Sequence, residues 1–125
     1  DDECVWALAN AYEKQGKLTL AVDRYGILKD RLVDPRERMR AKRCWAEQSF
    51  ALACRLDQVR RYEDAERLFL SVLDGTDKVN IGEDFYEEVQ LNLAMTLQNM
   101  MRGDEASAIL VEVRSTTYSK KRRSQ

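Results

Sequence analysis

Three stretches of the chain repeat the same order of large and small apolar residues. Each stretch begins with Leu-Ala, and a large apolar residue follows three positions after the Ala. A second Ala stands at the same distance from the first in all three stretches, and it is followed by a large residue and then by another apolar residue. Spacings of three and four residues are typical of one face of a helix. Each stretch therefore predicts two antiparallel helices that approach closely at their alanines, and such hairpins are expected to stack because one alone cannot bury its apolar face. The three sets are Leu8, Ala9, Tyr12, Ala21, Tyr25 and Leu28; Leu52, Ala53, Leu56, Ala65, Phe69 and Val72; and Leu93, Ala94, Leu97, Ala106, Leu110 and Val113.

The polar and turn-forming positions between these stretches predict six helices. Asp34, Pro35 and Glu37 supply an N-cap, a proline at the first helical position and an acidic residue in the first turn. Residues 74–82 are rich in turn formers and predict a loop. The predicted helices cover about 2–15, 17–33, 35–59, 62–73 and 84–101, with a sixth that ends near Arg114.

We expect one domain over residues 1–114, with repeats at about 2–34, 35–74 and 84–114. Residues 115–125 are polar and basic. They are expected to form either a tail or the start of a truncated capping helix.

This pattern resembles the tetratricopeptide repeat family. That family's motif places Leu, a small residue and Tyr on a first helix, and Ala, an aromatic residue and Ala on a second. The first stretch matches best, with Gly16 ending its first helix. The alanines at 21, 65 and 106 are 44 and 41 residues apart, longer than the usual period of 34. In this respect the chain is similar to kinesin light chain type repeats. The motif's closing proline is missing from all three repeats.

The resemblance implies an all-α solenoid of about three stacked antiparallel hairpins. It also implies that the first helix of each hairpin lines a concave face that binds a partner. The family's positions in that face carry over onto Trp6, Phe50 and Leu91; Asn10, Cys54 and Met95; Glu13, Asp57 and Gln98; and Glu3, Glu47 and Glu88.

An apolar stripe flanked by carboxylates would suit an apolar or amphipathic segment with Lys or Arg on its flanks. The alternative for Trp6 and Phe50 is that both pack in the core. Family members that clamp a chaperone's C-terminal carboxylate use Lys and Asn on the first helix, Asn on the third, and Lys and Arg on the fifth. The matching positions here lack the basic residues and are Trp6, Asn10, Ala51, Glu88 and Asn92. Such a ligand is therefore disfavoured.

Composition narrows the function further. The chain has 125 residues, one proline, five glycines and a net charge of −1, so no overall field favours nucleic acid or a membrane surface. No apolar run approaches the roughly 20 residues that span a bilayer. The chain begins at Asp1 rather than Met, and we expect a fragment or a processed form.

The residue types that usually carry chemistry are scarce. Histidine is absent, which removes the commonest general base and metal ligand, and the scattered glycines form no phosphate loop. Cys44 and Cys54 would lie about 15 Å apart on one helix, too far for a disulfide. With Cys4 they predict three reduced thiols in an intracellular, reducing compartment. We predict no enzyme activity, catalytic residue, cofactor or metal site.

Two basic segments remain. One crowds the start of the 35–59 helix, where positive charge opposes the helix dipole. Its spacing spreads the charges around the helix and favours a solvated extension. The other basic segment lies near the end of the chain. It is a nuclear localisation signal, a contact to nucleic acid or anionic lipid, or the exposed start of a closing helix, and we favour the closing helix. Interleaved aromatic residues are absent, which disfavours nucleic acid binding by stacking. The residues are Arg36, Arg38, Arg40, Lys42 and Arg43, and then Lys120, Lys121, Arg122 and Arg123.

Together these features predict a non-enzymatic protein–protein interaction module: a scaffold, adaptor or assembly factor that binds a protein or peptide segment. One alternative is a structural subunit buried permanently in a large complex. Another is an RNA-binding module that uses the basic segments, with an affinity that falls steeply with salt.

Overall fold

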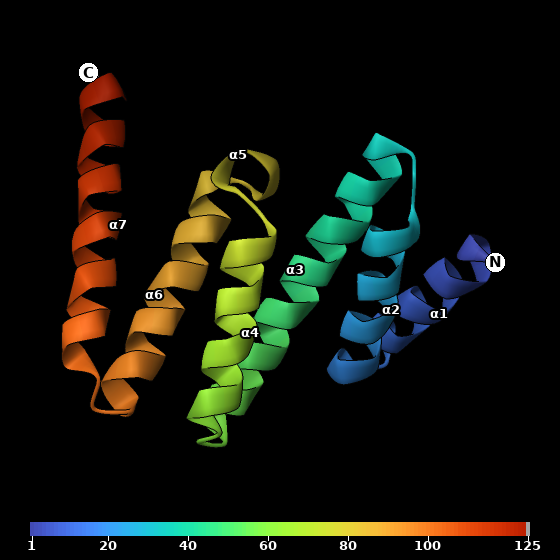
Figure 1. Cartoon of the computed structure of the whole chain (residues 1–125), viewed down its shortest axis with the longest axis horizontal. Helices are drawn as coiled ribbons and strands as arrows, with labels where there is room; N and C mark the ends of the chain where they lie inside the picture. The colour runs from blue at the N-terminus through green and yellow to red at the C-terminus, as the bar shows by residue number, and fades with distance from the viewer. Residues whose placement is uncertain (125) are drawn as a thin grey trace.

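The computed structural model describes residues 1–124, apart from the side chains of Lys120 and Ser124, and helices are the only regular secondary structure in this part of the chain (Figure 1). The predicted all-α class is confirmed. In Figure 1 the helices follow one another in chain order along the longest axis, with the termini at opposite ends. The helices are α1 (Asp2–Lys14), α2 (Leu18–Arg31), α3 (Pro35–Gln58), α4 (Tyr62–Gly75), α5 (Lys78–Ile81), α6 (Glu83–Asn99) and α7 (Gly103–Ser124).

Two segments differ from the sequence prediction. The predicted loop 74–82 contains the single-turn helix α5, which starts where the Asp77 carboxylate accepts a hydrogen bond from the Asn80 N–H at 2.9 Å. Helix α7 does not end near Arg114 but continues to Ser124. The apolar spacing stops after Val113, yet the exposed polar residues that follow can extend a helix whose first half is already held against α6. Gln125 lies outside the described residues.

The three turns that join α1 to α2, α3 to α4 and α6 to α7 have the same backbone hydrogen bonds. After α1, the Gly16 N–H donates to the Glu13 carbonyl at 3.1 Å and the Lys17 N–H donates to the Tyr12 carbonyl at 2.9 Å. This is the Schellman ending, which needs one residue with positive φ. The equivalent donors are Arg60 and Arg61 after α3, and Met101 and Arg102 after α6. The positive-φ residues are Gly16 at 74°, Arg60 at 65° and Met101 at 63°.

The long helices have a regular order of directions. Asp2 at the start of α1 pairs with Arg31 at the end of α2, 3.3 Å apart, so these helices are antiparallel. Helices α1, α3 and α6 instead run parallel to one another. Earlier residues of one helix contact earlier residues of the next, and later residues contact later residues. These contacts join Trp6 to Arg40 and Gly16 to Arg55 between the first hairpin and α3, and Phe50 to Phe85 and Asp57 to Thr96 between α3 and α6.

Small residues lie at the centre of the packing. The repeated alanines of the sequence pattern, at positions 9, 21, 53, 65, 94 and 106, are all buried. Buried side chains form two clusters, one in the first hairpin with the start of α3 and one from the rest of α3 to α7. Trp45 packs against both clusters. Its indole approaches Gly26 of α2 and Gly75 of α4.

Met101→Gly should stabilise the chain. Met101 is 90% exposed and has a φ that strains any residue with a Cβ, so glycine relieves strain and loses no packing. We expect the free energy of unfolding in urea to rise by roughly 0.5–1 kcal/mol. Met101→Ala keeps the Cβ and is the matched control. An equal gain in the alanine variant would contradict this explanation.

Alanine should have opposite effects at the two glycines that face Trp45. At Gly26 a Cβ would lie 3.6 Å from the indole, an ordinary contact, and alanine inside a helix gains about 0.5–1 kcal/mol. At Gly75 it would lie 3.0 Å from the ring, so the ring must move at a cost of about 1 kcal/mol or more. Thermal unfolding followed by circular dichroism should show a higher Tm for Gly26→Ala and a lower one for Gly75→Ala. A higher Tm in both variants would show that the indole is not held tightly between α2 and α4.

Candidate functional site

The predicted partner-binding residues all belong to α1, α3 and α6, which lie beside one another through the contacts described above. The surface formed by these three helices is called here the first-helix face. Some of its predicted contact residues are half-buried within the fold, whereas others are open to solvent. The two groups differ in what they can offer a partner.

Trp6 is half-buried and is enclosed by its own molecule on two sides. Its ring meets the Tyr25 ring edge-on, with centroids 6.1 Å apart. The Arg40 guanidinium of α3 lies over it, 4.7 Å from the ring centroid. Such a cation–π contact ties α1 to α3 and leaves only part of the indole for a ligand.

Phe50 is also half-buried, and its ring lies between two other aromatic rings. The Phe69 centroid is 5.9 Å away and the Phe85 centroid is 5.5 Å away. Phe50 packs against the larger buried cluster. These contacts hold the Phe50 side chain within the fold, in agreement with the alternative, raised from the sequence, that Phe50 packs in the core.

A polar cluster lies beside Trp6. The Tyr25 hydroxyl is 2.8 Å from both the Asn10 amide oxygen and a Glu13 carboxylate oxygen. Burial, and then the Glu13 carboxylate, raise the pKa of Tyr25 above its usual value, so its proton stays in place. Asn10 and Glu13, both predicted to contact a partner, thus also hold α1 against α2.

A second polar cluster joins α3 to α6. The Cys54 thiol lies 3.9 Å from the Asn92 amide oxygen. The buried Thr96 hydroxyl donates a hydrogen bond of 2.8 Å to the Asp57 carboxylate. Burial raises the pKa of the Cys54 thiol, and the charges of Asp57 and Glu88 raise it further. Cys54 therefore favours the neutral thiol, as does Cys44, whose pKa is raised by burial and by Glu47.

Among the predicted contact residues, two apolar side chains and four carboxylates are exposed, and one of these carboxylates, Glu13, is the partner of Tyr25 described above. Leu91 is 40% exposed and Met95 is 60% exposed, one helical turn apart on α6. Glu3, Glu47 and Glu88, from α1, α3 and α6, are exposed as well. The apolar surface accessible to a partner is therefore provided by α6 rather than by the two aromatic residues.

Two adjoining hollows lie along α3 and share Arg43 and Glu47. They are called here the α3 groove. One has a volume of about 420 Å³. The other, of about 270 Å³, opens between α3 and the segment from α5 to the start of α6. The remaining lining residues are Arg36, Met39, Arg40 and Cys44 in the first hollow, and Val79, Ile81, Gly82 and Phe85 in the second.

The first basic segment is divided between two sides of α3. Arg36, Arg40 and Arg43 line the α3 groove. Their spacing of four and then three residues could have shown this. Arg38 and Lys42 line a different hollow with Val33 and Pro35.

The second basic segment lies at the other end of the molecule, in the last turns of α7. Lys121, Arg122 and Arg123 are exposed there, and the Arg122 guanidinium lies 5.9 Å from the Tyr118 ring centroid. The side chain of Lys120 is outside the described residues. This segment is separate from the first-helix face, since it belongs to α7.

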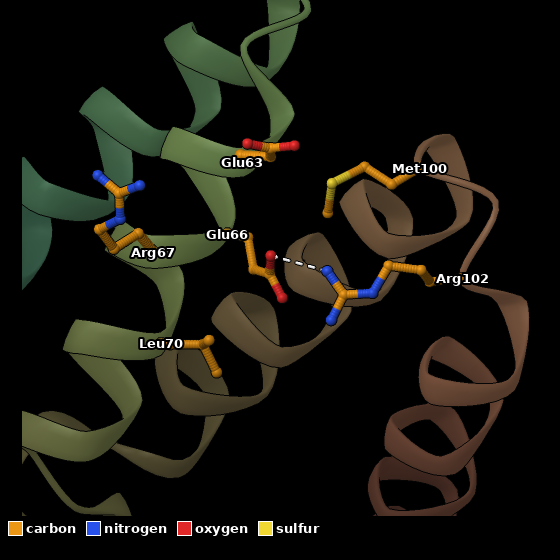
Figure 2. A pocket seen from close by; sticks show the side chains of 6 residues that line it. All are labelled: Glu63, Glu66, Arg67, Leu70, Met100 and Arg102. Atoms are coloured by element: carbon orange, nitrogen blue, oxygen red, sulfur yellow. Dashed lines mark hydrogen bonds and ion pairs between the residues drawn. The ribbon is translucent and has the colours of Figure 1, made fainter.

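A hollow of about 660 Å³ lies elsewhere, between α4 and the turn from α6 to α7 (Figure 2). Figure 2 shows Glu66 and Arg102 pointing toward each other from its two sides, at a distance of 2.8 Å. Arg102 also pairs with Glu105. Two of the charged residues that line this hollow, Glu66 and Arg102, are thus already paired with each other.

Comparison with protein-family models, with curated proteins and with solved structures gave no match. Within residues 1–124, no helix is both long and apolar enough to cross a membrane. The same residues bring together no group of three potential metal-binding side chains among Cys, Asp and Glu. All three cysteines are free thiols, and Cys4 is the exposed one.

Phe50→Ala should destabilise the chain. Truncation removes two aromatic contacts in the larger cluster, and the free energy of unfolding in urea should fall by about 2–4 kcal/mol. Leu91→Ala on the same face is the control and should cost less than about 1 kcal/mol, because Leu91 is 40% exposed. A Phe50 variant as stable as the Leu91 variant would show that Phe50 is not part of the core.

Proposed function

We propose that the chain is a non-enzymatic protein–protein interaction module of the tetratricopeptide repeat type, a stack of three helical hairpins. The first-helix face would bind a segment of another protein. The observation that carries the proposal is the parallel course of α1, α3 and α6, given by the contacts of Trp6 with Arg40, Phe50 with Phe85 and Asp57 with Thr96. With helices in this arrangement, equivalent positions of the three repeats would form rows on one surface.

The identical turns support the repeat interpretation. Three Schellman endings with the same hydrogen bonds occur at positions 16, 60 and 101, which have the same spacing as the alanines at 21, 65 and 106. Repetition of both the packing residues and the backbone geometry is what a repeat protein requires.

The charges of the face select the partner's chemistry. Arg36, Arg40 and Arg43 line the α3 groove, and none of them forms an ion pair of 4.0 Å or less with a described carboxylate. Glu88 and Glu3 are exposed on the neighbouring helices. A segment with acidic residues in the groove and basic residues beside these carboxylates would bind in one direction only.

Apolar anchors would occupy the surface between these charges. Leu91 and Met95 of α6 and Val79 at the groove wall are exposed apolar side chains, and Ile81 beside Val79 is partly buried. Anchors of this kind usually contribute most of the binding energy, while the charges around them set specificity and association rate.

The test is a selection of short random peptides on the immobilised chain, followed by fluorescence anisotropy with the selected sequences. We expect the double variant Leu91→Asp/Met95→Asp to weaken binding at least about tenfold. Leu20→Asp is the matched control, because Leu20 is similarly exposed, at 42%, but lies on α2. Circular dichroism must show that all variants are equally helical.

Selected peptides that combine apolar residues with an acidic and a basic end would support the proposal. Equal binding to both variants would place the site outside the first-helix face. A selection that yields no specific peptide would contradict the proposal and favour the permanently buried structural subunit.

A further inference from the structure

The first half of α3 concentrates positive charge in a chain whose net charge is only −1. Residues 36–43 contain five basic side chains and one carboxylate, that of Glu37. None of the five forms an ion pair of 4.0 Å or less with a carboxylate among the described side chains. By contrast, Arg61 and Arg102, in the turns after α3 and α6, are both paired with carboxylates. The five residues, called here the α3 basic surface, are Arg36, Arg38, Arg40, Lys42 and Arg43.

These charges lie on two sides of α3 rather than in one groove. Three of them, Arg36, Arg40 and Arg43, line the α3 groove. The other two, Arg38 and Lys42, line the hollow on the other side of the helix. A peptide segment in the α3 groove would leave Arg38 and Lys42 without a partner, whereas a broad anionic surface can contact both sides at once.

Two strongly exposed valines flank the α3 basic surface. Val33 is 89% exposed and lines the hollow on one side of α3. Val79 is 88% exposed and lies on the other side, where the Arg43 Nε donates a hydrogen bond of 3.0 Å to the neighbouring Asn80 carbonyl. Figure 1 shows the α2–α3 connection and α5, which contain these valines, at one edge of the molecule, and the turns after α1, α3 and α6 at the opposite edge. Exposed apolar side chains therefore accompany the basic ones at the first edge.

We propose that this edge binds the surface of an anionic membrane, with the α3 basic surface among the lipid headgroups and Val33 and Val79 inserted between them. Clustered Lys and Arg side chains attract anionic lipids, and exposed apolar residues add contact at the interface. Residues 36–43 extend about 10 Å along α3, which is close to the Debye length at physiological salt. The five charges therefore act on the same surface. The proposal does not rest on the peptide site, because Arg38, Lys42 and Val33 lie outside the α3 groove.

The side chains around the basic residues favour lipid over nucleic acid. A phosphate backbone would pair with the arginines but offers nothing apolar to Val33 and Val79, and residues 33–43 contain no aromatic side chain on which a base could stack. The carboxylates beside the two valines are engaged within the fold. Asp34 accepts a hydrogen bond from the N–H of Glu37 at 3.1 Å, and Asp77 accepts one from the N–H of Asn80. Both carboxylates thus cap the helices that follow them.

Cosedimentation with lipid vesicles tests the proposal. At about 150 mM salt the chain should bind phosphatidylcholine vesicles that contain roughly 30% phosphatidylserine, and it should not bind vesicles of phosphatidylcholine alone. Arg36→Gln/Arg38→Gln/Lys42→Gln should weaken binding at least about tenfold, because each basic residue near an anionic surface contributes to the attraction. Arg40 and Arg43 stay unchanged in this variant, since they also contact Trp6 and the Asn80 carbonyl.

A matched variant controls for the loss of net charge. Lys14→Gln/Lys17→Gln/Arg60→Gln removes the same three charges from exposed residues at the opposite edge. It should bind the anionic vesicles as the wild type does, because these residues lie away from the proposed contact.

A second pair of variants tests the apolar contact. Val33→Ser/Val79→Ser should weaken binding to the anionic vesicles at least about threefold, because the apolar side chains no longer enter the interface. Val59→Ser/Met101→Ser is the control, since these residues are 62% and 90% exposed but lie at the opposite edge. Circular dichroism must show that all variants are equally helical, as substitutions at solvent-facing residues predict.

Several results would overturn the proposal. A wild-type chain that does not bind the anionic vesicles would do so. Equal weakening by the two charge variants would show that overall charge, rather than the α3 basic surface, is responsible. A Val33→Ser/Val79→Ser variant that binds vesicles like the wild type would also contradict the proposal, and tight binding of a single-stranded RNA oligonucleotide would then identify nucleic acid as the ligand.

Discussion

The structure depends on one indole ring that joins its two buried clusters. Trp45 of α3 packs against both, lying between Gly26 of α2 and Gly75 of α4, with the Lys29 ammonium 4.7 Å from the ring centroid. At Gly75 the ring occupies space that a Cβ would need, whereas a Cβ at Gly26 would make only an ordinary contact with it. The first hairpin and the rest of the chain thus form one packed body, in which the positions of α1 and α6 relative to α3 are determined by packing.

Close approach of the helices follows from the buried alanines and from the turns that follow them. The same ending, with one positive-φ residue, directs each second helix back along its first helix. The sequence has glycine in only one of these turns, so Arg60 and Met101 take a strained conformation that the surrounding hydrogen bonds maintain. In the proposed repeat stack, this shared turn geometry would place equivalent residues in rows on the candidate binding surface.

Residues on the first-helix face divide between internal and external roles. Trp6, Phe50, Glu13 and Asp57 contact other parts of the molecule, so their positions are set by packing and hydrogen bonding. Leu91, Met95 and the arginines of the α3 groove are exposed, although Arg40 also lies over Trp6 and Arg43 donates a hydrogen bond to the Asn80 carbonyl. A partner would therefore meet a surface whose supporting residues are already in place, which lowers the entropic cost of binding.

The sequence by itself determined the helical class, most helix boundaries and the buried alanines, because apolar spacing and turn residues act over a few positions. It did not predict α5 or the length of α7, which follow from a capping carboxylate and from support by α6. The surroundings of Phe50 and the α3 groove were decided only in three dimensions. Helices α3 and α6 must first lie side by side before the ring of Phe85 can reach Phe50, or Val79 and Ile81 can face Arg43 across a hollow.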